Sequence, residues 1–182
     1  MISKPWLFGI AGVLGGVLWA LVPFVDEAYS AHPEILVFVP LLLLLATYGV
    51  KARFRGDVPF TAVSPLVVGL GILTLDAVWL ASTTNGNLGS VFLIGIPALA
   101  GLVFVGIGSV LLARRLHDVE QFPNSMAVLF AVALPFDPVF NGIVTPLLGG
   151  GLSLYGLAWV LVGFELTQTD RETRSGSTNW TP

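Results

Sequence analysis

The feature that most constrains this chain is a series of long apolar blocks separated by short polar connections. The blocks run to roughly 16 to 25 residues, which as helices rising 1.5 Å per residue match a hydrocarbon core about 30 Å thick. Because lipid cannot satisfy free backbone polar groups, a chain crossing it must hydrogen-bond within each segment. The blocks therefore predict helices in a membrane.

The composition agrees with lipid as the main solvent. The chain is 55% hydrophobic and 10% charged, against about 25% charged residues in an ordinary soluble domain. It contains no cysteine, which excludes disulfides, thiolate metal sites and iron–sulfur clusters. A net charge of -3 gives no basic footprint for nucleic acid. We expect the lipid bilayer as a partner, and no nucleic acid.

The sequence predicts an all-α integral membrane protein, a six-helix transmembrane bundle with both termini cytoplasmic. The expected spans are residues 6–25, 35–50, 60–81, 88–112, 126–145 and 147–166. Residues 1–166 form one domain, and residues 167–182 are expected to be a polar, disordered cytoplasmic tail. Short connections favour antiparallel neighbours, and faint internal echoes leave three helical hairpins open as the arrangement.

The orientation follows from the basic residues. With six spans, all eight lysines and arginines lie on one side, whereas the connections "DEAYSAHPE" and "STTNGN" on the other side contain none. The positive-inside rule assigns the basic side, and with it both termini, to the cytoplasm. We expect a multi-pass protein of a plasma membrane. The scarcity of lysine beside arginine and the acidic polar segments fit a prokaryote, and in particular a salt-adapted one.

Glycines recur at spacings that return to one face of a helix. In lipid, close backbone approach at such small residues carries much of helix packing. The predicted packing glycines are Gly12, Gly16, Gly101, Gly108, Gly156 and Gly163.

Asp76 and Asp137 are the ionisable residues well inside the predicted spans. Each lies 12 residues beyond a serine near the start of its span, or about 18 Å along an ideal helix, in the outer half of the membrane. An aspartate at the bilayer centre costs about 2.5 to 3.5 kcal/mol on insertion scales, so it is usually turned inward, paired or protonated. One interpretation is an ion or solute site with Asn141 nearby. The other is a carboxyl that hydrogen-bonds a neighbouring group such as the Thr74 hydroxyl.

The stretch "LPFDPVFNGIVTP", residues 134–146, predicts a helix break. Pro135 and Pro138 each remove a backbone donor and disfavour helical geometry in the preceding residue. We expect Asp137 at a kinked or broken segment near the outer face, turned toward the bundle or an outward crevice, with an external loop as the alternative.

Catalytic, cofactor and metal sites are not predicted. His32 and His117 fall in connections on opposite sides of the membrane, so they cannot share a metal, and no span contains a lysine for a Schiff base. Ser153 in "GLSLYG" has no histidine within the membrane to activate it. Whether the chain is an enzyme stays open, with the balance against.

The sequence does not identify a reaction or a ligand. The favoured interpretation is a small polytopic membrane protein that acts as a non-enzymatic binding, sensing or assembly subunit, as a homo-oligomer or with a membrane protein partner. The alternative is a transporter or channel for a small solute or an ion, a proton or a cation, that uses Asp76 and Asp137.

Overall fold

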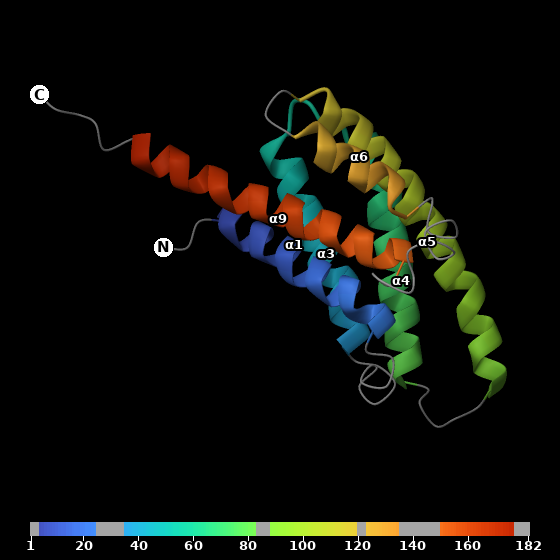
Figure 1. The fold of residues 1–182 in the computed structure, drawn as a ribbon. Helices are drawn as coiled ribbons and strands as arrows, with labels where there is room; N and C mark the ends of the chain where they lie inside the picture. The colour runs from blue at the N-terminus through green and yellow to red at the C-terminus, as the bar shows by residue number, and fades with distance from the viewer. Residues whose placement is uncertain (1–3, 25–34, 83–87, 120–122, 135–149, 177–182) are drawn as a thin grey trace, which may run out of the picture.

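The computed structural model describes residues 4–24, 35–82, 88–119, 123–134 and 150–176 (Figure 1). In these ranges the chain forms six α-helices and one short 3-10 helix, with no strand. The α-helices are α1 (Lys4–Leu21), α3 (Ile35–Arg53), α4 (Phe60–Ser82), α5 (Leu88–His117), α6 (Asn124–Val132) and α9 (Gly150–Gly176), and the 3-10 helix is η1 (Val22–Phe24). The predicted all-α class is confirmed.

The helices form a ring in chain order (Figure 1). Each helix packs on the next described helix, and α9 returns to pack along α1, so the first and last helices close the ring. The two are antiparallel, because Gly9 lies beside Thr167 while Gly16 lies beside Gly156. Packing therefore continues around the ring and is not confined to three separate hairpins.

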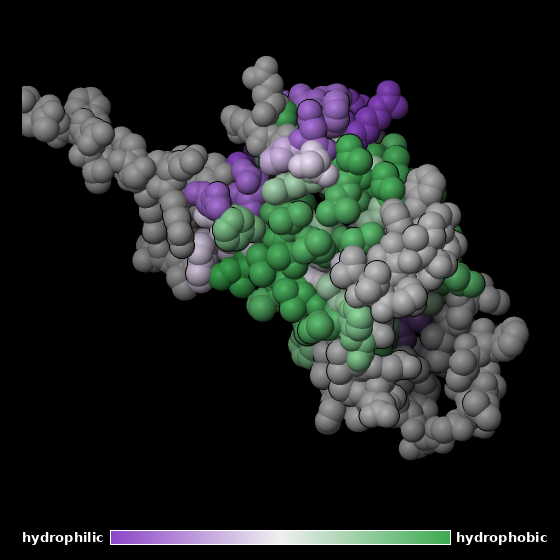
Figure 2. All heavy atoms as spheres, viewed as in Figure 1, coloured by the Kyte–Doolittle hydropathy of each residue, from purple (hydrophilic) through white to green (hydrophobic). Residues whose placement is uncertain are grey.

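Within the described residues, three helical segments are long and apolar enough to cross a membrane, namely Leu36–Arg53, Phe60–Trp79 and Pro97–His117. Trp6–Leu21 in α1 is a shorter apolar helix. Large hydrophobic side chains also cover the outside of the bundle, with Leu75 71% and Phe60 67% exposed. Figure 2 shows a broad apolar area on the visible face, with hydrophilic residues gathered at its upper edge. Such a surface fits contact with lipid and not with water.

The helix bounds differ from the predicted spans mainly at their ends. α3, α4 and α5 begin at the predicted residues. α3 and α5 continue beyond their predicted ends through basic residues in their last turns. Positive charge there interacts favourably with the negative end of the helix dipole. α9 continues to Gly176, into the predicted tail. α6 ends at Val132, and residues 135–145 of the fifth predicted span lie outside the described residues.

The centre of the bundle is an aromatic cluster, formed by Trp19, Phe130, Tyr155 and Trp159. Phe130 and Trp159 pack edge to face with ring centroids 4.9 Å apart, and Tyr155 lies 5.4 Å from Phe130. All four residues are buried. Packing of this kind adds about 0.5 to 1.5 kcal/mol per aromatic pair beyond simple burial.

Polar contacts gather at one end of the bundle. Arg53, at the end of α3, donates from Nη1 to the backbone oxygen of Glu165 in α9 at 3.0 Å. Lys51 donates to the backbone oxygen of Val58 in the connection to α4. Because α4 and α5 are antiparallel, Arg114 near the end of α5 lies at this same end. We call it the basic end.

Candidate functional site

The first close helix contact is between α1 and α9. A Cβ atom added at Gly156 would lie 2.5 Å from the Gly16 oxygen and 2.5 Å from the Ala20 nitrogen. A Cβ at Gly163 would lie 2.5 Å from the Gly9 oxygen, and one at Gly12 would lie 3.0 Å from the Gly163 Cα. The two backbones are therefore in direct contact, which only glycine permits at these positions. We call this contact the α1–α9 seam.

A second contact of the same kind joins α4 and α5. A Cβ at Gly69 would lie 2.6 Å from the Gly101 oxygen and 2.6 Å from the Val105 nitrogen, and one at Gly108 would meet the Leu66 backbone. We call this contact the α4–α5 seam. The six glycines predicted for packing thus all lie in one of the two seams. Gly69 also lies in the α4–α5 seam, but the sequence does not predict it as a packing glycine, because no second glycine stands four residues away from it on α4.

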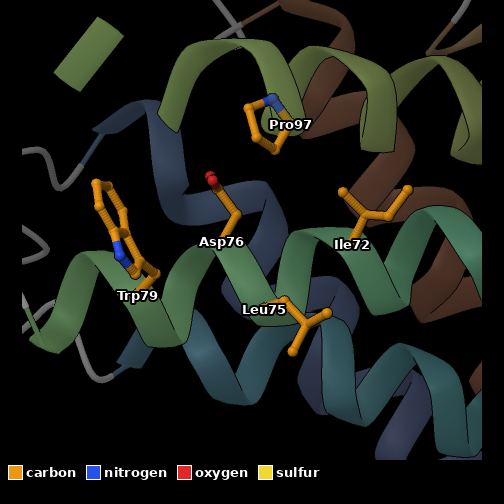
Figure 3. A pocket seen from close by; sticks show the side chains of 5 residues that line it. All are labelled: Ile72, Leu75, Asp76, Trp79 and Pro97. Carbon is orange, nitrogen blue, oxygen red and sulfur yellow. The ribbon is translucent and has the colours of Figure 1, made fainter. Parts of the chain in front are cut away.

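A pocket lies just beyond the α4–α5 seam, at the end of the bundle opposite the basic end. It has a volume of about 520 Å³ and is lined by Ile72, Leu75, Asp76, Trp79 and Pro97. Asp76 is one helical turn from Ile72 on α4, while Pro97 on α5 is one turn before Gly101. In Figure 3 the Asp76 carboxylate points between the Trp79 indole and the Pro97 ring. The pocket therefore combines one carboxylate with an apolar and aromatic wall.

The Asp76 carboxylate makes no hydrogen bond or ion pair with the residues that the structure describes. Thr74, the sequence-based candidate partner, donates its hydroxyl to the Leu70 oxygen at 2.8 Å, one turn back on its own helix. That bond is common for threonine within helices. The Thr74 hydroxyl therefore does not donate to the Asp76 carboxylate. The side chain is partly buried and faces the pocket (Figure 3).

The rest of the predicted ion or solute site cannot be placed beside Asp76. Asp137 and Asn141, together with the predicted helix-break residues Pro135 and Pro138, lie outside the described residues.

A polar contact that the sequence did not indicate crosses the centre of the bundle. Ser109 on α5 donates to the Val105 oxygen at 2.7 Å, and its Oγ lies 2.9 Å from the Tyr155 Oη on α9. Because the single Ser109 proton is used on Val105, Tyr155 is the donor to Ser109. Trp159 Nε1, also buried here, makes no hydrogen bond with the described residues. No motif marks these residues, since they come from helices that are not neighbours in the ring.

Ser153 donates its hydroxyl to the Ala20 oxygen at 2.9 Å, which gives it a packing role between α9 and α1. Among the described residues there is no group of three histidine, cysteine or acidic side chains that fits a metal ion. What the Asp76 pocket can do is hold a ligand by charge and by apolar contact. No protein-family model, curated protein or solved structure matches the chain, so the chemistry of the site is argued from its own residues.

Proposed function

We propose that this protein is a six-span bundle of the plasma membrane, with both termini in the cytoplasm, that works as a non-enzymatic binding subunit. Three long apolar helices support membrane crossing. The close antiparallel contact of α1 with α9 supports crossing by those two helices as well. The grouping of Lys51, Arg53 and Arg114 at the basic end supports the cytoplasmic assignment of that end.

The proposed recognition site is the Asp76 pocket. The observation that carries the proposal is a carboxylate without a partner among the described residues, in a pocket of about 520 Å³ whose other described lining residues are apolar or aromatic. Small-molecule sites have volumes of roughly 300 to 1,000 Å³ and are mainly apolar with a few placed polar groups. An unpartnered carboxylate at membrane depth is unfavourable, so a ligand that supplies positive charge stabilises it.

Transport through Asp76 and Asp137 is the alternative, and the packing of the bundle favours binding over it. Phe130, Tyr155 and Trp159 are each at most 1% exposed and fill the space between the helices. A path for ions needs polar groups or water along the membrane normal. Asp76 lies at the periphery of the bundle, beside the exposed Leu75, and not in the buried aromatic cluster at its centre.

Photo-crosslinking in intact cells tests the binding proposal. The photoreactive residue p-benzoylphenylalanine replaces Leu75, which lines the pocket, or as a control Val78, which is exposed on the same helix outside the pocket. After irradiation we expect an adduct of one defined mass at position 75, lost when Asp76→Asn is added, and no such adduct at position 78. The proposal is wrong if both positions give only lipid adducts whether or not Asp76 is present.

The transport alternative has a separate test in proteoliposomes. Transport predicts that the parent protein moves protons or monovalent cations faster than a variant with Asp76→Asn and Asp137→Asn. Equal rates for the two proteins, or no flux through the parent, exclude the alternative. Neither result bears on whether position 75 gives an Asp76-dependent adduct.

A further inference from the structure

We propose that the Asp76 pocket binds a lipophilic organic cation, such as a quaternary ammonium or phosphonium compound, that enters from the bilayer. This ligand class rests on the proposed binding function. Three observations support this ligand class. A carboxylate and an aromatic ring share the pocket, the pocket has too few oxygen ligands for a metal ion, and the surface around its mouth is apolar.

The pocket pairs a negative charge with an aromatic ring. Asp76 and Trp79 are three residues apart on α4 and so lie on neighbouring parts of one helix face. Figure 3 shows the carboxylate and the indole flanking the same space. A cation between them gains Coulomb attraction from the carboxylate and cation–π attraction from the ring, and tryptophan is the strongest of the aromatic side chains in that role.

A bare metal ion is a poor fit for the same pocket. Calcium takes about six to eight oxygen ligands, and magnesium about six in strict octahedral geometry. Asp76 is the only carboxylate among the five described residues that line the pocket, and the others are Ile72, Leu75, Trp79 and Pro97. In a lipophilic organic cation the charge is covered by apolar groups. Such a cation loses little hydration free energy when it leaves water, so it is compatible with an apolar wall.

The shape of the pocket favours a small molecule over a partner helix. The α4–α5 seam holds the two helices together from Gly69 and Gly101 toward the basic end, so no groove continues from the pocket in that direction. A docked helix needs a groove several turns long for anchors at successive turns. Leu75, which lines the pocket on α4, and Leu99, which follows Pro97 on α5, are both strongly exposed. A ligand dissolved in lipid can reach Asp76 past these side chains.

Equilibrium dialysis with tetraphenylphosphonium tests the proposal on the purified full-length protein in lipid nanodiscs. We expect saturable binding of about one cation per chain, weakened at least tenfold by Asp76→Asn and retained within a few-fold by Asp76→Glu. Trp79→Leu should weaken binding several-fold. Tetraphenylborate has the same shape with the opposite charge and should not bind saturably. Asp57→Asn is the matched control, because Asp57 is an exposed aspartate at the basic end.

The outcomes separate the ligand class from the binding function. If tetraphenylphosphonium binds the parent and Asp76→Asn equally, or does not saturate, the organic-cation proposal is overturned. If it fails to bind while position 75 still gives an Asp76-dependent adduct, the binding function stands and the ligand class is wrong. An adduct that is itself a protein assigns the site to a partner helix. A thermal unfolding midpoint for Asp76→Asn at or above that of the parent shows that lost binding is not lost folding.

Discussion

Replacing Gly156 by alanine tests the α1–α9 seam with the smallest change available. The new methyl group would lie 2.5 Å from the Gly16 oxygen and 2.5 Å from the Ala20 nitrogen, where an ordinary contact begins at 3.4 Å. Both neighbouring atoms belong to backbone, so no side chain can rotate away. The helices must separate by about 1 Å, which also loosens the contacts on either side of the substitution.

The size of the effect follows from overpacking of a filled interface, which costs about 1 to 3 kcal/mol. For a chain of this length that corresponds to a fall of roughly 2 to 12 °C in the unfolding midpoint. Leucine at the same position adds volume against the same backbone and should prevent assembly of the bundle. Intrinsic tryptophan fluorescence during heating in detergent measures the midpoint, because Trp159 and Trp19 lie in the buried cluster near Gly156.

Gly71→Ala is the matched control on another apolar helix. A Cβ at Gly71 would have no neighbour within 4 Å, so the substitution changes only helix propensity, which favours alanine by up to about 1 kcal/mol. The midpoint should stay the same or rise. If Gly156→Ala unfolds at the same temperature as Gly71→Ala, then the α1–α9 seam does not support the fold and the argument for close glycine packing fails.

Three further predictions follow from the described contacts. A double-mutant cycle with Ser109→Ala and Tyr155→Phe should give a coupling near 0.6 kcal/mol and not above about 1.7 kcal/mol, as for hydrogen bonds between membrane helices; zero coupling would refute the bond. In a chain without native cysteine, an impermeant maleimide should label Gly56→Cys only from the cytoplasm and Ser82→Cys only from outside, whereas labelling from one common side would refute crossing by α4. Asp76→Leu should raise the unfolding midpoint, because it removes a partly buried carboxylate without a partner in the described structure; a lower midpoint would show that the carboxylate supports the fold.

The helices were predictable from sequence where hydrophobicity alone decides their limits. α3, α4 and α5 begin at the residues where apolar blocks begin. Hydrophobicity did not predict the end of α9, because this helix continues to Gly176 through a polar segment. Glutamate, glutamine and arginine are good helix formers, so a helix can outlast the apolar block that defines its span. Hydropathy marks the lipid boundary and not the helix end.

Asp76 could be predicted from the sequence as a candidate site residue, but the pocket that surrounds it could not. Asp76 stands out because a lone carboxylate interrupts an apolar block. Its neighbour Pro97 comes from another helix, and the register between them depends on the contact of Gly69 with Gly101. Spacing within one helix carries no information on that register. The same reason hides the Ser109 contact with Tyr155, which joins helices that do not follow one another in the ring.

The α4–α5 seam also indicates how a ligand would meet the protein. The backbone contact at Gly69 and Gly101 lies about two turns from Asp76 along α4 and about one turn from Pro97 along α5, so the pocket lies beside a firmly packed part of the bundle. Sliding α5 along α4 would require the seam itself to open, because backbone atoms already touch there. Binding to a preformed pocket avoids that cost and leaves the helices in place. A carrier instead needs one group of helices to move against another. The seams therefore favour a subunit that holds its ligand over one that carries it across.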